Sequence, residues 1–424
     1  MNKIIFIYQL FLILVSISFG NTKIDGTLYK IDKSKVEIKM DSKDIHKSIQ
    51  TRLILAQSGD IIYLPKGELE IHRSLWADGL HNVTIVGHGI DETILSFANQ
   101  IEGAEGIKIT NSNQITLKNF TIQNSKGDLI KVEDTKGINF INIKAQWTGG
   151  PNSLNGSYAL YPVKSEDVYI DSCVAIGASD AGIYVGQSKN IIVKNSEAYY
   201  NVAGIEIENS TNADVFNNYT HDNSGGILVF DLPDLLIKKG AKVRVFDNKV
   251  EYNNIANFAP PGNIVAKVPA GTGIMILATS EVEIFNNDIS NNKTANTSIV
   301  SYFITEEPIT DSLYYPYPTS IYLYDNKYNR DKQFPSFSFG QPIGFLLAYK
   351  FWRNIPDIIY DGIIDSTLLN NGLLPDEYKI CIENNSNATF VNLDASNDFN
   401  NMTQDLSNHY CSHKKIEPVK LNKR

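Results

Sequence analysis

The chain of 424 residues has only three cysteines, and no two of them form a Cys-x-x-Cys pair. It also has no glycine-rich phosphate loop, no His-Glu-x-x-His sequence and no Gly-x-Ser-x-Gly sequence. These motifs are typical of thiol redox proteins, nucleotide-dependent enzymes, zinc proteases and serine esterases. The sequence therefore gives no support to any of these four classes.

Basic residues are in deficit, because 38 Lys and Arg stand against 47 Asp and Glu, a formal net charge of −9. Proteins that hold nucleic acid usually carry a basic excess where they contact phosphates. The balance therefore argues against nucleic acid as a partner. An acidic glycan remains open as a ligand, because it would need only a local basic strip.

The first 20 residues have the pattern of a signal peptide. Lys3 forms a basic start, residues 4–18 are apolar, and Ser18-Phe19-Gly20 is a small-x-small cleavage site. A membrane anchor is the alternative, but Gln9 interrupts a run that is shorter than a bilayer requires. We expect cleavage, no membrane span in the mature chain, and a periplasmic or extracellular location.

An exported chain can oxidise its cysteines, and an odd number leaves one over. Cys381 and Cys411 lie in the non-repetitive C-terminal part, so we predict that they form a disulfide. Cys173 lies inside a regular apolar alternation, which favours a buried free thiol.

A short apolar alternation recurs along the chain, with a spacing of 22 residues from Gly182 to Gly204 and from Gly204 to Gly226. It is found at Ile107-x-Ile109, Ile130-x-Val132, Ile183-x-Val185, Ile205-x-Ile207, Ile227-x-Val229 and Ile274-x-Ile276. A second alternation follows each one after about eight residues. Period-two alternation predicts strands, and units that cannot bury a face alone must stack. The period predicts an all-β solenoid, a parallel β-helix.

A polar column follows the second strand of each repeat: Asn119, Asn142, Asn195, Asn217 and Asn286, with Ser172 and Asp247. We interpret it as a structural ladder at left-handed corners rather than a ligand site. Residues 45–53 place Ile45, Ile49 and Leu53 on one helical face and predict an N-terminal capping helix.

These patterns predict four segments: a signal peptide at 1–20, a capping segment at 21–57, the β-helix at 58–395 and a C-terminal tail at 396–424. Within the tail, we expect HYCSHKKIEPVKLNKR to be basic and loosely held. Two insertions interrupt the cadence, one after Trp147 and one from Leu232 to Thr272. Loops carry function more often than regular strands do.

The segment AQSGDIIYLPKGE resembles the right-handed parallel β-helix superfamily of pectate lyases and alginate epimerases. WTGGPNSLNGSYALYPV, IGASDAGIYVGQS, NVAGIEIENS and GGILVFDLPD look like a bacterial family of exported parallel β-helix repeat proteins. This resemblance implies a right-handed helix, export, and in many cases a second exported protein as partner. It implies no settled reaction. The Asp-Pro-His-Asp motif of the epimerases is absent, so their catalytic residues are not carried over.

Outward positions of the first strand form a column that we expect to face solvent: Lys108, Lys131, Tyr161, Tyr184, Glu206, Leu228 and Met275. Neighbouring strands lie about 4.8 Å apart, so adjacent members can share one ligand. Asp180, Gln187, Glu208, Asp231 and, on a preceding turn, His221 lie beside this column.

Three chemistries remain open for this face. A lyase or epimerase would use Tyr184 or His221 as acid or base and Lys131 to neutralise developing charge, with Tyr161 and Asp180 nearby. A glycoside hydrolase would pair Glu206 with Asp180 or Asp231. Alternatively, Glu206, Glu208 and Asp231 would bind Ca²⁺.

Lys108, Trp147 and Gln187 are candidates for substrate contact. Trp147 is equally suited to plugging the base of its insertion, and exposed Tyr and Glu are often ordinary surface residues. The leading expectation is binding of an extracellular or envelope polysaccharide, and lyase or epimerase modification of that polysaccharide is left open. A scaffold that docks a partner protein is the main alternative.

Overall fold

The computed structural model describes residues 45–338 and 342–422. The predicted signal peptide lies outside these residues. Within them, no helix is long and apolar enough to cross a membrane.

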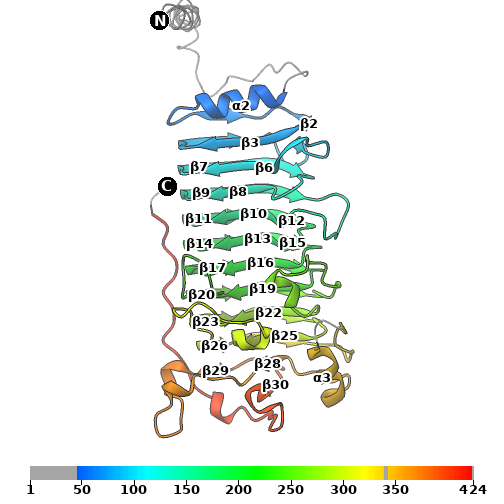
Figure 1. The fold of residues 1–424 in the computed structure, drawn as a ribbon, viewed down its shortest axis with the longest axis vertical. Helices are drawn as coiled ribbons and strands as arrows, with labels where there is room; N and C mark the ends of the chain where they lie inside the picture. The colour runs from blue at the N-terminus through cyan, green and yellow to red at the C-terminus, as the bar shows by residue number, and fades with distance from the viewer. Residues whose placement is uncertain (1–44, 339–341, 423–424) are drawn as a thin grey trace, which may run out of the picture.

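The described residues form the predicted right-handed parallel β-helix (Figure 1). One sheet has 11 strands: β3(Arg73–Asp78), β6(Glu102–Thr110), β8(Ile130–Glu133), β10(Tyr158–Val163), β13(Ala181–Gly186), β16(Ala203–Glu208), β19(Gly225–Phe230), β22(Thr272–Leu277), β25(Ala295–Val300), β28(Ile358–Tyr360) and β30(Phe390–Asn392). We call it the first sheet, because it contains the first strand of each repeat.

A second assembly of 19 strands completes each coil. One row contains β1(Ile61–Tyr63), β4(His81–Val86), β7(Asn113–Gln123), β9(Lys136–Gln146), β11(Glu166–Asp171), β14(Lys189–Lys194), β17(Thr211–Phe216), β20(Ala241–Phe246), β23(Ser280–Phe285), β26(Thr319–Tyr324) and β29(Ile380–Glu383). The other contains β2(Gly67–Glu70), β5(Thr93–Ser96), β12(Val174–Ile176), β15(Glu197–Tyr199), β18(Tyr219–His221), β21(Lys249–Glu251), β24(Asp288–Ser290) and β27(Lys327–Asn329). The long strands β7 and β9 pair with both rows.

The repeat aligns like residues between coils. Ile183 pairs with Ile205, and Ile205 pairs with Ile227, so the inward isoleucines form a continuous stack. All three are fully buried. Burying such a side chain contributes about 1.5–3 kcal/mol, and each coil depends on its neighbours for that burial.

The predicted capping helix is present as α2(Ile45–Leu55), which buries Ile49 and Leu53 against the first coil. The Gln50 side chain donates to Trp76 O and accepts from Trp76 N, at 2.7 and 2.9 Å. The side-chain amide thus pairs with backbone groups of β3, the first strand of its sheet. This contact caps an edge that would otherwise be open to pairing with another chain.

The polar column has the predicted left-handed corners, with φ between 50° and 61° at its seven residues. The continuous buried ladder begins one residue later. In it, Asn218 donates to Asn248, Asn248 to Asn287 and Asn287 to Asn326, at 2.9–3.0 Å. Each amide therefore links consecutive coils from inside the solenoid.

The expectation that the outward column of the first sheet faces solvent is wrong for its central part. Tyr184 and Glu206 are only 4% and 1% exposed. The insertion from Leu232 to Thr272 and the segment 302–314 pack over this face, where a second apolar cluster includes Leu228, Phe230 and Tyr314. The apolar residues on β19 and β22 explain this cover, because they would otherwise be exposed to water.

The C-terminal tail is not loosely held, contrary to expectation. A disulfide joins Cys381 to Cys411, and the chain then returns along the helix, as its red trace shows (Figure 1). Backbone N–H groups of Ile416 and Val419 donate to Glu283 and Asp214, at 3.0 and 3.1 Å. The tail therefore contacts strands far from the last coil. Cys173 is a buried free thiol.

Candidate functional site

Strand register brings the central residues of the outward column together. Tyr161 follows Leu160, which pairs with Ile183, and Tyr184 pairs with Glu206 on the next strand. Glu208 is the next outward residue of β16, since Ile205 and Ile207 point into the core. We call Tyr158, Tyr161, Asp180, Tyr184, Glu206 and Glu208 the acid–tyrosine cluster.

Tyr184 reaches diagonally across the sheet to Glu208. Its hydroxyl donates to Glu208 Oε1 at 2.6 Å. Gly186 makes this reach possible, because a Cβ at that position would lie 2.1 Å from the Tyr184 hydroxyl oxygen. The glycine is therefore required by the close approach of the phenol to its backbone.

Asp180 precedes β13 and receives two donors. The Tyr158 hydroxyl lies 3.4 Å from Asp180 Oδ2, and Asn263 Nδ2 lies 3.2 Å from the same oxygen. Asn263 belongs to the insertion that covers the sheet, immediately before the turn η2(Ile264–Lys267). The insertion thus fixes one carboxylate of the cluster from above.

Glu206 is the least satisfied group of the cluster. Its Oε2 atom is buried and has no hydrogen-bond partner within the described part of the chain. A buried carboxyl oxygen without a donor costs more than the net gain of an ordinary hydrogen bond. Such a group is uncommon in a purely structural position, and it points to a ligand that completes the site.

Burial changes the acidity of all three carboxyl groups. It raises the pKa of Asp180 to about 8, aided by the nearby charge of Glu208. Burial also raises the pKa of Glu208 to about 7, although the bond from Tyr184 opposes the change. The pKa of Glu206 lies well above its ordinary range because of burial and its neighbours Asp180 and Glu208. The cluster can therefore hold and release protons near neutral pH.

The three tyrosine rings lie against one another. Ring centroids of Tyr158 are 4.4 Å from those of both Tyr161 and Tyr184. Burial raises the pKa of Tyr158 and Tyr184 well above that of a free phenol, so both hydroxyls remain hydrogen-bond donors. Lys131 lies at the edge of the group, 5.0 Å from the centroid of the Tyr161 ring. Its Nζ is also 3.7 Å from Glu133.

Sequence analysis missed Tyr158, Asp128 and Asn263. The Asp128 carboxylate accepts the Tyr158 N–H at 3.1 Å, and burial raises the pKa of Asp128 to about 6. Tyr158 begins β10 two positions before the inward Leu160, so strict alternation would have placed it in the core; it instead packs against the outer cluster. Asn263 lies in an insertion with no periodicity, and its approach to Asp180 follows only from tertiary structure.

The prediction that His221 lies beside the column on a turn is wrong. It belongs to β18 of the other sheet assembly, where it pairs with Tyr199 and Glu251. Its Nδ1 and Nε2 atoms contact Asp222 and Glu197, at 2.8 and 3.1 Å. These partners fix the His221 ring, which stacks against the rings of Tyr199 and Tyr219 on the same sheet assembly.

The structure does not support substrate contact by Trp147 or Gln187. Trp147 is buried, and its Nε1 donates to Ser125 O at 2.9 Å, so it plugs the base of its insertion. Gln187 Oε1 accepts the N–H groups of Leu236 and Ile237, at 3.1 and 3.3 Å. Its role is to hold the covering insertion. Lys108 lies 3.6 Å from Glu105, three coils from Tyr184 in the column.

The predicted Ca²⁺ ligands do not converge. Across the described ranges, no group of three or more His, Cys, Asp or Glu side chains is arranged to hold a metal ion. Asp231 Oδ1 instead accepts the Gly240 N–H at 2.9 Å and closes the start of the insertion. Glu208 is engaged by Tyr184, so Glu206, Glu208 and Asp231 do not form the expected site.

A family model described as "Right handed beta helix region" matches residues 80–237. Among curated proteins there is no significant match. Among solved structures, the chain is similar to the A-module of the Azotobacter vinelandii mannuronan C-5 epimerase AlgE4. The identity is 15%, 68% of this chain and 84% of that chain are covered, and the TM-score is 0.44.

DFA-IIIase from Arthrobacter chlorophenolicus A6, solved with DFA-III, is 14% identical over 83% of this chain and 96% of that chain, with a TM-score of 0.41. ORF18 of Geobacillus virus E2 is 12% identical over 67% and 58% of the two chains, with a TM-score of 0.31. These identities are too low to transfer an activity. The family match and the coil architecture together identify the chain as a right-handed parallel β-helix protein.

Proposed function

We propose that this protein is exported and binds a carbohydrate at the acid–tyrosine cluster, where it acts on a glycosidic bond by acid–base catalysis. The unpartnered, buried carboxyl oxygen of Glu206 carries the proposal. A scaffold gains nothing from three carboxyl groups buried together, because their burial and mutual repulsion are unfavourable. A catalytic site gains acids whose proton affinity suits neutral pH.

The geometry favours hydrolysis of a glycosidic bond over the lyase or epimerase alternative. Tyr184 donates a hydrogen bond to Glu208, and its raised pKa keeps the phenol protonated, so the phenolate that a base requires is not available. Lys131 lies close to Glu133 rather than to these carboxyl groups. A uronate ligand would also bring a further carboxylate toward the acidic groups, so a neutral glycan is the better match.

Glu206 and Asp180 are the proposed catalytic pair. Glu206 keeps its proton and would donate it to the leaving oxygen, as a general acid does. Asp180, held by Tyr158 and Asn263, would act as the second carboxylate once it has released its proton. Tyr158 and Tyr161, which are partly exposed, offer amphipathic rings suited to contact with a sugar.

The test is a screen of neutral and uronate-containing glycans with the mature protein. Reducing ends, ultraviolet absorbance of unsaturated product and thermal shift would be measured. We expect new reducing ends without unsaturated product, and a loss of at least a hundredfold in turnover in Glu206→Gln and Asp180→Asn. Glu133→Gln is the matched control, because Glu133 lies on β8 of the same sheet and pairs with Lys164.

Unsaturated product would overturn the hydrolytic assignment in favour of a lyase. Unchanged turnover in both cluster variants would place the reaction elsewhere. If no glycan gives new reducing ends, ultraviolet absorbance or a thermal shift, the proposal is contradicted and a scaffold that docks a second protein is favoured.

A further inference from the structure

The helix α3(Ile343–Phe351) presents an aromatic stripe to solvent. Phe345 and Tyr349 lie one turn apart on the helix, Trp352 directly follows its end, and the three are 44%, 84% and 66% exposed. Contiguous apolar patches of this kind are uncommon on soluble monomers and mark interaction surfaces. Aromatic residues in particular are enriched where proteins meet the membrane–water interface.

A second segment extends the stripe. The Phe334 ring lies 4.7 Å from Trp352, and Phe337 lies 5.1 Å from Phe345. The helix is held close to this segment at Gly344, where a Cβ would lie 2.0 Å from Ser336 O. We call Phe334, Phe337, Phe345, Tyr349 and Trp352 the aromatic patch.

The local charge is opposite to that of the whole chain. Residues 332–353 contain Lys332, Lys350 and Arg353 and no Asp or Glu, whereas the complete chain carries −9. All three cations are exposed. A basic, aromatic helix face on an acidic protein matches an anionic surface, because the cations attract the phosphates while the rings enter the interface.

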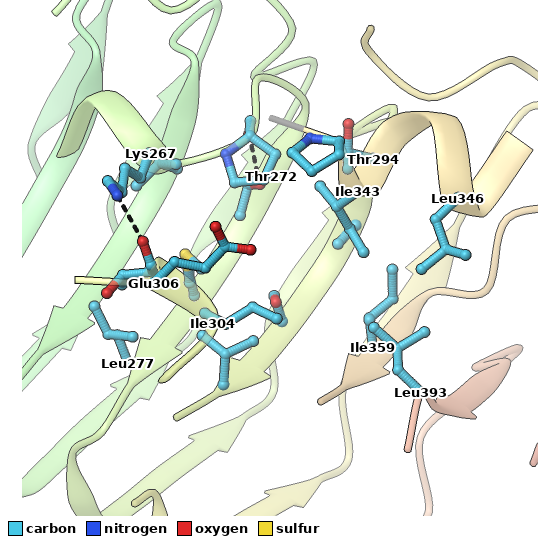
Figure 2. A pocket seen from close by; sticks show the side chains of 18 of the residues that line it. Lys267, Thr272, Leu277, Thr294, Ile304, Glu306, Ile343, Leu346, Ile359 and Leu393 are labelled. Carbon is cyan, nitrogen blue, oxygen red and sulfur yellow. Dashed lines mark hydrogen bonds between the residues drawn. The ribbon is translucent and has the colours of Figure 1, made fainter. Parts of the chain in front are cut away.

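A cavity of about 340 Å³ lies against the opposite face of the same helix. Figure 2 shows side chains of the first sheet, the covering segments and α3 gathered around it, including Leu277, Ile304 and Ile343. The volume is within the range of about 300–1,000 Å³ typical of small-molecule sites. Further aliphatic side chains line it: Met275, Val300, Leu346, Ile359 and Leu393.

Four of the six polar side chains that line this cavity have partners in the protein, namely Thr272, Thr294, Thr305 and Lys267; the other two are Ser298 and Glu306. The hydroxyls of Thr272, Thr294 and Thr305 donate to backbone carbonyls, at 2.6–2.8 Å. Lys267 bonds to Thr305 O and Glu307, at 2.6 and 2.5 Å. A polar ligand would compete with these bonds, whereas an alkyl chain requires none of them.

We propose that the aromatic patch docks the protein on an anionic lipid surface and that the cavity receives one acyl chain from it. The two faces of α3 have different roles: the aromatic face enters the lipid–water interface, and the opposite face lines the cavity. This inference uses no residue of the acid–tyrosine cluster and stands independently of the proposed reaction.

The first test is flotation of the purified mature protein with vesicles of phosphatidylcholine, alone or with 30 mol% phosphatidylglycerol. We expect binding to the anionic vesicles, and a loss of about fivefold in affinity for each of Lys350→Gln and Arg353→Gln. The triple variant Phe345→Ser, Tyr349→Ser, Trp352→Ser should lose at least tenfold. Trp76→Ser is the matched control, because Trp76 is 50% exposed at the other end of the solenoid.

The second test addresses the cavity through displacement of a fluorescent fatty acid by soluble alkanols. Affinity should rise about fourfold for each added methylene until the cavity is full. Ser298→Phe should abolish displacement, because Ser298 lies between Met275 and Ile359 and points into the cavity. Ile304→Trp, from a covering turn, is a second blocking variant, and Ser153→Phe in an exposed loop is the control. Thermal unfolding would establish that each variant is folded.

Vesicle binding that is lost in the triple variant, together with chain-length-dependent displacement that is lost in Ser298→Phe and Ile304→Trp, would support the proposal. Failure to bind either vesicle, or equal binding by the triple variant, would overturn it. Displacement by alkanols without vesicle binding would also overturn it and assign the cavity to a free fatty acid.

Discussion

The Tyr184 hydroxyl and the Glu208 carboxylate form a 2.6 Å hydrogen bond across two strands of the first sheet. The bond links neighbouring coils on the outside of the solenoid, whereas the asparagine ladder links them inside. It also sets the state of the acid–tyrosine cluster, because it opposes the rise in the pKa of Glu208 that burial causes.

Tyr184→Phe should lower the free energy of unfolding by about 1–3 kcal/mol, because it leaves Glu208 without its donor. The pKa of Glu208 should rise above about 7, which carboxyl titration by NMR or infrared spectroscopy would measure. Gly186→Ala should have a similar effect, because its Cβ displaces the phenol. Tyr161→Phe, at a half-buried ring of the same cluster, is the control. An unchanged Glu208 pKa in both Tyr184→Phe and Gly186→Ala would contradict this account.

The stability of the protein should decrease as pH rises from about 4 toward 8. Asp180, Glu206 and Glu208 have raised pKa values in the folded state, so the folded protein retains protons that the unfolded chain releases. Each retained proton contributes a slope of about 1.4 kcal/mol per pH unit between the unfolded and the folded pKa. Its stabilising contribution is complete below the unfolded pKa and is lost as pH rises through the folded pKa. Glu206→Gln should make the slope shallower by up to that amount.

Denaturant unfolding at several pH values measures this slope. Glu133→Gln is the control with the opposite sign, since Lys164 lowers the pKa of Glu133 and its contribution is lost only at acid pH. A slope in Glu206→Gln equal to that of the wild type between pH 5 and 8 would show that Glu206 does not retain its proton.

Asn248→Ala should be among the most destabilising single changes in the solenoid, by about 2–4 kcal/mol. The amide accepts from Asn218 and donates to both Asn287 and Val215 O, so its removal leaves buried groups unpaired on two coils. Chemical denaturation would give the value. Asn99→Ala, at an exposed asparagine, should cost less than about 0.5 kcal/mol, and equal losses would refute the structural role of the ladder.

Loss of the Cys381–Cys411 disulfide should free the tail. Closing a loop of this length stabilises a protein by about 3–4 kcal/mol, and the sequence separation is 30 residues. In Cys381→Ser, Cys411→Ser, trypsin should cut the basic residues after 411 more rapidly, as mass spectrometry would show. Cys173→Ala, which touches no disulfide, controls for loss of a thiol. Equal cleavage rates would mean that the hydrogen bonds to Asp214 and Glu283 are sufficient to hold the tail.

The period of 22 residues was sufficient to predict the coils, because strands that repeat in register must place like residues side by side. It correctly placed Tyr184 next to Glu206 and Leu228 in one column. It could not predict that these residues are buried, since the covering insertion has no period. The insertion is held in place by individual hydrogen bonds. One of these joins Asn263 to Asp180, which lie 83 positions apart in the sequence.

The same limit explains the error at His221 and the alternative that was left open at Trp147. Histidine and tryptophan are residue types that suit catalysis or sugar binding. The sequence does not show that, in the folded protein, their side chains are already engaged by neighbouring residues. The pKa shifts of the acid–tyrosine cluster were equally out of reach, because they arise from burial under a distant segment rather than from the strand that carries the carboxylates.

The returning tail changes how the coils depend on one another. In a simple stack each coil contacts only its neighbours, so an end can fray while the middle stays folded. Here the final residues contact Asp167, Asp214 and Glu283, which belong to β11, β17 and β23. Unfolding of the last coils would therefore also break the hydrogen bonds between the tail and the coils in the middle of the solenoid. Because the tail connects distant coils, we expect the solenoid to unfold more cooperatively than a stack in which each coil contacts only its neighbours.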